Sequence, residues 1–73
     1  MQPDTVNATP LVVNGQQTET DARTLADLVR AHGFGEAEVA TALNGEFVPR
    51  GARAATLLSA GDKVEIVAPR QGG

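Results

Sequence analysis

The residues best suited to chemistry lie at the C-terminus, in the run Pro69-Arg70-Gln71-Gly72-Gly73. Glycine has no Cβ atom, so a Gly-Gly end can enter a channel too narrow for any other dipeptide. The chain has no cysteine, and the α-carboxylate of Gly73 is therefore the obvious handle for covalent chemistry. We predict Gly73 as the site of modification and Arg70, Gln71 and Gly72 as the residues that thread into a partner. Fraying of an ordinary chain end is the alternative interpretation.

A strand pattern comes directly before this run. In Lys63–Ala68 the apolar residues Val64 and Ile66 alternate with charged ones, which is typical of a strand with one buried face. Pro69 has no N–H and is a poor residue to continue a central strand. Residues 69–73 contain no apolar side chain to hold them against a core, and we expect an extended, mobile tail with a reach of ~17 Å.

The length of 73 residues predicts one small domain. Its apolar content of 41%, with two Phe and no Trp or Tyr, predicts a core of aliphatic side chains. The first nine residues are polar and contain Pro3, whereas an apolar run begins after Pro10. We therefore divide the chain into a flexible leader at 1–9, a folded domain at 10–68 and the tail at 69–73.

Charge and composition exclude several classes of function. Six basic residues against nine acidic ones give a net charge of −3, which disfavours nucleic-acid binding and favours a partner with a basic docking surface. Without cysteine there is neither a disulfide framework nor a thiolate metal site. No apolar run approaches the ~20 residues of a membrane span, and we expect a cytoplasmic protein that does not bind membranes.

Two Asn-Gly pairs predict two hairpins, because a type I′ turn needs positive φ at both central positions. Asn14-Gly15 separates Leu11–Val13 from Gln16–Thr20. Asn44-Gly45 separates the expected strand Val39–Leu43 from a short one at Glu46–Val48.

One helix is predicted between the hairpins, with a capping residue at each end. Thr24 is a good N-cap, and Gly33 is suited to end the helix as a C′ residue in the left-handed conformation. The expected buried stripe, at i, i+3, i+4 and i+7, comprises Leu25, Leu28, Val29 and His32. His32 is the sole histidine and has no neighbouring ligand type, so we interpret it as a half-buried structural residue of the last turn rather than a metal ligand or catalyst.

These elements predict an α+β fold with a mixed sheet of four to five strands and one main helix packed across one face. Residues 50–60 are expected to be irregular, with Leu57 and Leu58 tucked under them as a plug of the core. If the first and last strands lie side by side in the middle, the intervening helix makes them parallel, which is the ubiquitin-like β-grasp arrangement.

Three stretches together carry a family resemblance. They are Leu11–Gly15, the run from Val39 through Asn44-Gly45 to Val48-Pro49-Arg50, and Gly61–Val67 with the terminal Gly72-Gly73. From Leu11 to Gly73 the chain resembles ThiS-type sulfur carrier proteins, which are ubiquitin-like β-grasp proteins of thiamine (thiazole) biosynthesis. The Gly-Asp turn and the Gly-Gly end are shared with MoaD-like molybdopterin-synthase small subunits.

The resemblance implies a carrier rather than an enzyme. An E1-like adenylyltransferase of the ThiF type would use ATP to adenylate Gly73, and a sulfur donor would convert the adenylate to a thiocarboxylate. A thiazole synthase of the ThiG type would then accept the sulfur. The carrier itself would bind no cofactor or metal.

Other positions carry weaker functional interpretations. Val12 and Val67 are expected on neighbouring central strands, on the face away from the helix, where they form a candidate docking surface or ordinary strand filler. Arg50 would contact a partner or only solvate a strand end, and Arg70 would meet an acidic channel wall or only solvent.

Three alternative functions stay open at this point. A molybdopterin-synthase small subunit would use the same chemistry with another acceptor. A ubiquitin-like protein modifier would form isopeptide bonds, although Lys63, the only lysine, disfavours chains of the ubiquitin kind. A plain interaction domain would have an incidental tail.

Overall fold

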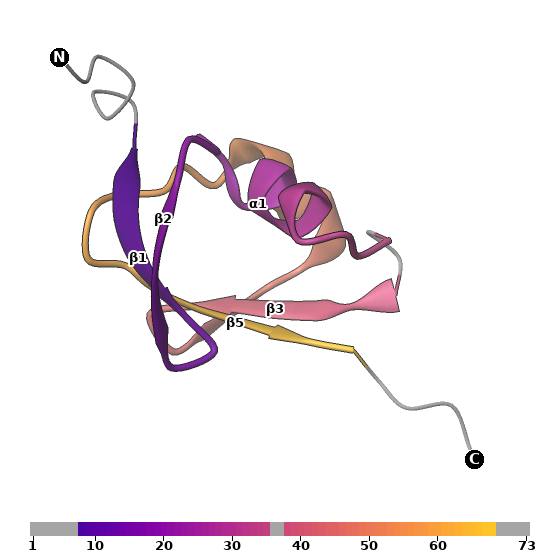
Figure 1. The fold of residues 1–73 in the computed structure, drawn as a ribbon. Coiled ribbons are helices and arrows are strands. Elements are labelled where there is room, and N and C mark those ends of the chain that lie inside the picture. The colour runs from indigo at the N-terminus through magenta and orange to yellow at the C-terminus, as the bar shows by residue number, and fades with distance from the viewer. Residues whose placement is uncertain (1–7, 36–37, 69–73) are drawn as a thin grey trace, which may run out of the picture.

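The computed structural model describes residues 8–35 and 38–68 and is built there from five strands, the helix α1 and short 3-10 segments (Figure 1). In chain order the elements are β1 (Thr9–Val13), β2 (Gln16–Thr20), α1 (Leu25–Ala31), β3 (Ala40–Leu43), β4 (Glu46–Val48), η3 (Arg50–Ala55) and β5 (Lys63–Val67). Strand β1 begins at Thr9, one residue ahead of the predicted start of the domain. Of the predicted leader at 1–9, the structure describes only Ala8 and Thr9, and residues 1–7 lie outside the described residues.

The strands form one mixed sheet in the order β2-β1-β5-β3-β4. Strand β5 pairs parallel with β1, with Val13 level with Val64, and antiparallel with β3, with Thr41 level with Ile66. Helix α1 covers one face of this sheet (Figure 1). The predicted α+β, ubiquitin-like β-grasp arrangement is therefore confirmed, with the first and last strands side by side at the centre.

The core lies between α1 and the sheet and is filled by aliphatic side chains, as predicted. Its buried members are Leu11, Val13, Leu25, Leu28, Val29, Val39, Val48, Val64 and Ile66. Phe34 is partly buried and packs against this cluster, whereas Phe47 lies outside it. The alternation of β1 and β5 explains the pattern, because every second residue of each strand points toward the helix.

The predicted turns and caps are present. Asn14 and Asn44 have φ of 52° and 51° and each is followed by a glycine with positive φ, which confirms both type I′ hairpin turns. The Asp27 N–H donates to the Thr24 hydroxyl at 3.1 Å, which confirms the N-cap. At the other end, Gly33 has φ of 83° and the Phe34 N–H donates to the Val29 carbonyl, so the helix closes in a Schellman motif.

Four local predictions are wrong. His32 is exposed rather than half-buried, because α1 ends at Ala31 and His32 is its C-cap, with its ring Nδ1 3.2 Å from the Leu28 carbonyl oxygen. Residues 50–55 form η3 rather than an irregular loop. Leu57 is 70% exposed, because the segment after η3 runs extended beside Thr24 and its alternation points only Leu58 toward the core. Strand β3 also begins at Ala40, one residue later than predicted.

Candidate functional site

The predicted site of modification, Gly73, lies with Arg70, Gln71 and Gly72 outside the described residues. The structure places the strand that leads to them. Strand β5 is the middle strand of the sheet, held by β1 on one side and by β3 on the other. The described chain ends one residue beyond it, at Ala68. The residues predicted to carry the chemistry therefore follow directly from the best-supported strand of the fold.

The face of the sheet turned away from α1 is the surface nearest to the end of β5. On β5 itself Val64 and Ile66 are buried, whereas Lys63, Glu65 and Val67 are exposed on this outer face. Val67, the last residue of the strand, is 57% exposed, which is unusual for a large aliphatic side chain on a central strand.

Val12 and Val67 both lie on the outer face, as predicted, but they do not meet. Val12 is half-buried and stands level with Lys63. Val67 lies four residues beyond Lys63 along β5, or about 13 Å at the rise of a strand, with Glu65 between them on this face. These two valines alone therefore do not form a continuous apolar surface.

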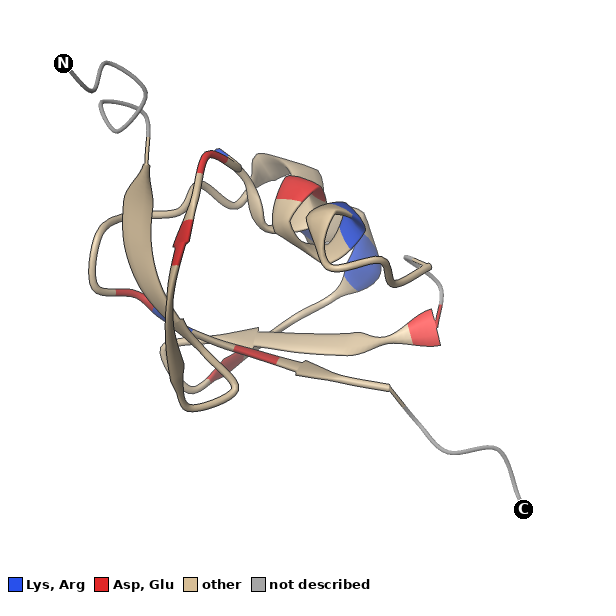
Figure 2. Ribbon diagram, viewed as in Figure 1, with Lys and Arg blue, Asp and Glu red and all other residues tan. Residues whose placement is uncertain are grey.

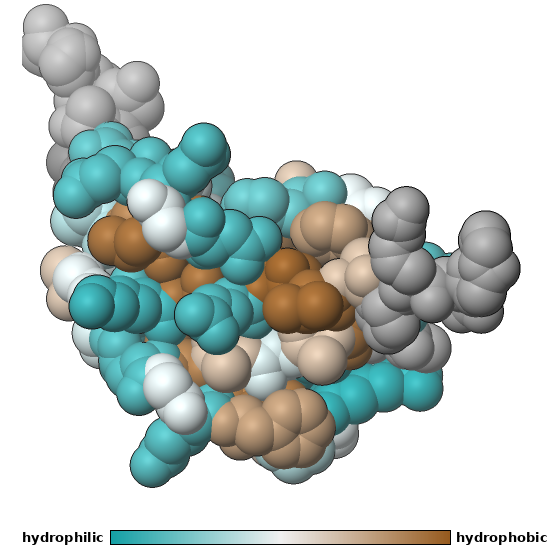
Figure 3. Space-filling view, turned by 90° about the horizontal axis from the view of Figure 1, so that it is seen from below, coloured by the Kyte–Doolittle hydropathy of each residue, from teal (hydrophilic) through white to brown (hydrophobic). Residues whose placement is uncertain are grey.

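The apolar residues nearest to Val67 on this face lie on β3, and Phe47 continues them on β4. Ala40 stands level with Val67, and Ala42 stands level with both Glu65 and Phe47. Phe47 is 69% exposed. We call Ala40, Ala42, Phe47 and Val67 the outer patch. Figure 3 views the molecule from below and shows brown and tan atoms across the middle of this face with teal atoms around them.

Sequence reasoning missed Phe47, although one signal was available. Val48 is buried, so its neighbour Phe47 has to point to the opposite face of the sheet. The sequence does not reveal which residue of β3 stands beside it, because that depends on the register of the β3·β4 hairpin.

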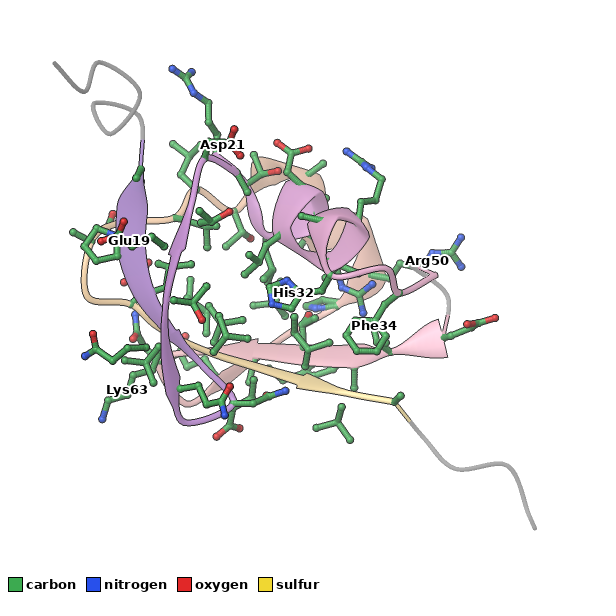
Figure 4. The ribbon with its side chains drawn as sticks, in the orientation of Figure 1. Glu19, Asp21, His32, Phe34, Arg50 and Lys63 are labelled. Atoms are coloured by element: carbon green, nitrogen blue, oxygen red, sulfur yellow. The ribbon has the colours of Figure 1, made fainter. Side chains whose placement is uncertain are left out.

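Arg50 lies at the start of η3, separated from β4 by Pro49. Val48 is level with Thr41, which is level with Ile66. The C-terminal ends of β4 and β5 therefore lie at the same end of the sheet. Arg50 is exposed and its side chain projects away from the body of the molecule (Figure 4). Arg50 is therefore available to a partner at that end of the sheet but is not part of the outer patch.

Charges of both signs occur on both sides of the sheet. Figure 2 shows arginines on α1 and η3, and acidic residues on α1 as well as on the strands and turns. On β5, Glu65 lies beside the outer patch, and Lys63 lines a shallow hollow with Asn44, Gly45 and Glu65. A partner that covers the outer patch therefore meets a carboxylate next to an apolar surface.

A second missed residue is Arg53, which is only 2% exposed. Its Nη2 donates to the Val39 carbonyl at 2.6 Å and its Nε to the Thr41 hydroxyl at 3.0 Å. That hydroxyl donates in turn to the Val48 carbonyl at 2.9 Å. One guanidinium thus joins η3 to the start of β3 and, through the Thr41 hydroxyl, to the end of β4. These contacts stabilise the end of the sheet at which β4 and β5 finish. Burial of this arginine has a structural role.

Residues 8–35 and 38–68 include no group of three His, Cys, Asp or Glu side chains arranged to hold a metal ion. In the same described ranges no helix is long and apolar enough to cross a membrane.

Comparison with known proteins identifies relatives. The model of the ThiS family matches residues 5–73. A crystal structure of the thiamine biosynthesis protein ThiS from Geobacter metallireducens is 35% identical and superposes with a TM-score of 0.72, covering 89% of this chain and all (100%) of that one. An NMR solution structure of a thiamine biosynthesis protein from the same organism is also 35% identical, with a TM-score of 0.74 and coverage of 89% and 88%. No curated protein matches the chain.

Proposed function

The chain belongs to the ThiS family, and on that premise we propose that it is a sulfur carrier protein of thiamine biosynthesis, with Gly73 as the residue that carries the sulfur. The observation that carries the proposal is the position of β5. This strand is paired on both sides, and the sequence beyond it runs to Gly72-Gly73 within five residues of Ala68. A firmly held strand followed by two glycines suits a carrier whose end enters another protein's active site.

The chemistry requires activation, because a carboxylate is a poor electrophile. A carboxylate oxygen of Gly73 attacks the α-phosphorus of ATP, and pyrophosphate leaves. The hydrosulfide anion (HS−), or a donor equivalent to it, then attacks the carbonyl carbon of the mixed anhydride and AMP leaves. The products are a thiocarboxylate on Gly73, AMP and a proton. The carrier contributes reach and recognition, and the partner enzymes contribute the catalytic groups.

The proposed partners are a ThiF-type adenylyltransferase, which uses the ATP, and a ThiG-type thiazole synthase, which accepts the sulfur. The carrier itself is not an enzyme in this scheme and holds no cofactor of its own. Both reactions are expected in the cytoplasm.

We assign docking of the adenylyltransferase to the outer patch. Phe47 and Val67 expose apolar area next to the end of β5, and exposed apolar area of this kind is typical of interaction sites. Glu65 lies beside them, so the complementary surface of the enzyme should be apolar with a basic residue at its rim. Arg50 and Val12 would lie at the margins of the contact.

Mass spectrometry of the intact protein tests the proposal. After incubation with a ThiF-type enzyme, ATP and sulfide, the chain should gain the mass difference between one sulfur and one oxygen. The matched control is the chain ending at Gly72, which should gain nothing. If the full chain also stays unchanged while the enzyme is active on another carrier, the proposal is wrong.

A genetic test separates thiazole synthesis from the molybdopterin pathway. Deletion of the gene should cause a growth defect that thiamine or its thiazole precursor repairs. Covalent adducts to other proteins, seen on denaturing gels, would indicate a protein modifier instead.

A further inference from the structure

Asn14 makes a contact that its place in a hairpin turn does not require. Strand β1 ends at Val13, level with Val64, and the positive φ of Asn14 turns the chain away from β5. The side chain of Asn14 nevertheless reaches β5. The Ile66 N–H donates to Asn14 Oδ1 at 2.9 Å, and Asn14 Nδ2 donates to the Ile66 carbonyl at 3.2 Å.

The amide of Asn14 therefore replaces a residue of β1. A primary amide offers one acceptor and one donor side by side, which is what the backbone of a further strand residue would offer to Ile66. The Asn14 N–H also donates to the Val64 carbonyl at 2.9 Å. Without the side chain, β5 would be paired on its β1 side only as far as Val64, although β3 still pairs with it as far as Val67.

Asn44 provides an internal comparison, because it occupies the same position in the other type I′ turn. Its Oδ1 accepts from the Lys63 N–H at 2.9 Å, and its Nδ2 donates to Asp62 Oδ1 at 3.1 Å. The two asparagines share backbone geometry and both reach β5 or the residue before it. They differ in position: Asn44 holds the start of β5, and Asn14 holds its last buried residue, Ile66.

We propose that Asn14 is a positioning residue for the carrier tail, whose side-chain amide anchors Ile66 and so sets where and in which direction the chain leaves the sheet. This proposal rests on the proposed function. An enzyme docked on the outer patch must find Gly73 at a set distance from Val67. Loosening β5 on one side, just before Val67, would add disorder that the enzyme has to remove on binding.

The test compares Asn14→Gly with Asn44→Gly. Glycine accepts positive φ, so both variants keep their turns, and each loses one side chain with two hydrogen bonds to β5 or its flank. Amide hydrogen exchange of Ile66 and Lys63 reports the anchor directly. The rate of pyrophosphate release by a ThiF-type enzyme with ATP, measured against carrier concentration, reports delivery of Gly73.

We expect Asn14→Gly to speed exchange at Ile66 by about fivefold to tenfold and to raise the KM for the carrier by about threefold to tenfold, with kcat unchanged. Asn44→Gly should speed exchange at Lys63 and leave the KM within about twofold. Equal effects of the two variants on KM, or no effect of either, would overturn the role of Asn14 in positioning.

The two proposals fail separately. If the wild-type chain releases no pyrophosphate with an enzyme that adenylates another carrier, the proposed function is wrong. The exchange experiment still decides on the anchor in that case, because selective loss of protection at Ile66 in Asn14→Gly supports it and unchanged protection overturns it.

Discussion

Replacement of Leu28 by alanine should remove a large part of the stability of this domain. Leu28 is 0% exposed and belongs to the core between α1 and the sheet. A buried Leu→Ala change costs about 2–5 kcal/mol of unfolding free energy, and the cost lies in the upper part of this range where the surroundings cannot close over the cavity. Helix α1 is tied to the segment after η3 by the Leu25 N–H, which donates to the Thr56 carbonyl at 2.9 Å, and its C-terminus is closed by the Phe34 N–H, which donates to the Val29 carbonyl at 3.3 Å. We therefore expect a loss of about 3–5 kcal/mol.

A loss of this size is measurable and can be set against a matched control. A chain of this length has a total stability of roughly 4–11 kcal/mol, and a loss of about 3 kcal/mol lowers the Tm by roughly 12 °C or more. Urea unfolding followed by far-UV circular dichroism suits a chain without Trp or Tyr. Leu57→Ala makes the same chemical change at a 70% exposed position and should cost less than about 0.5 kcal/mol. Similar midpoints for the two variants would refute the assignment of the core.

Three further outcomes are expected. Phe47→Ser should weaken binding to the adenylyltransferase by about tenfold in calorimetry, whereas Val12→Ser should weaken it by less than about threefold; a larger effect at Val12 would move the docking surface. Arg53→Met should cost about 1–3 kcal/mol in urea unfolding, because the Val39 carbonyl loses a buried donor, and an unchanged midpoint would show that this hydrogen bond is dispensable. Deletion of Gly72 and Gly73 should abolish thiocarboxylate formation in intact-mass measurements and leave the Tm within about 2 °C, since neither residue has an apolar side chain to bury; a large fall in Tm would contradict this separation of fold and function.

Local features of the fold could be predicted because each depends on a few neighbouring residues. The Asn-Gly pairs specify their turns through backbone φ, and Thr24 and Gly33 specify the ends of α1. The parallel pairing of β1 with β5 follows from the helix between them once both strands are placed at the centre. The failures at His32 and Leu57 concern single side chains at element ends, where one residue of shift reverses the direction of a side chain.

The outer patch could be predicted only in part, because its composition depends on register between strands that are distant in sequence. Val67 was found from its own strand, but Phe47 and Ala40 join it only through the pairing of β3 with β4 and β5. Burial of Arg53 was not predictable from residue type, since arginine is mostly exposed and its partners lie more than ten residues away. The role of Gly73 lies beyond the described residues and stays a prediction.

The parallel arrangement of the first and last strands affects how the domain resists force. A pull applied to the chain ahead of β1 and beyond β5 would act along the two neighbouring strands in opposite directions. Such a load falls on their hydrogen bonds at the same moment, including both bonds of the Asn14 amide, rather than opening them one after another as at the free edge of a hairpin. A protein that pulls on the end of β5 would therefore act on a mechanically stiff domain, which resists unfolding under that force.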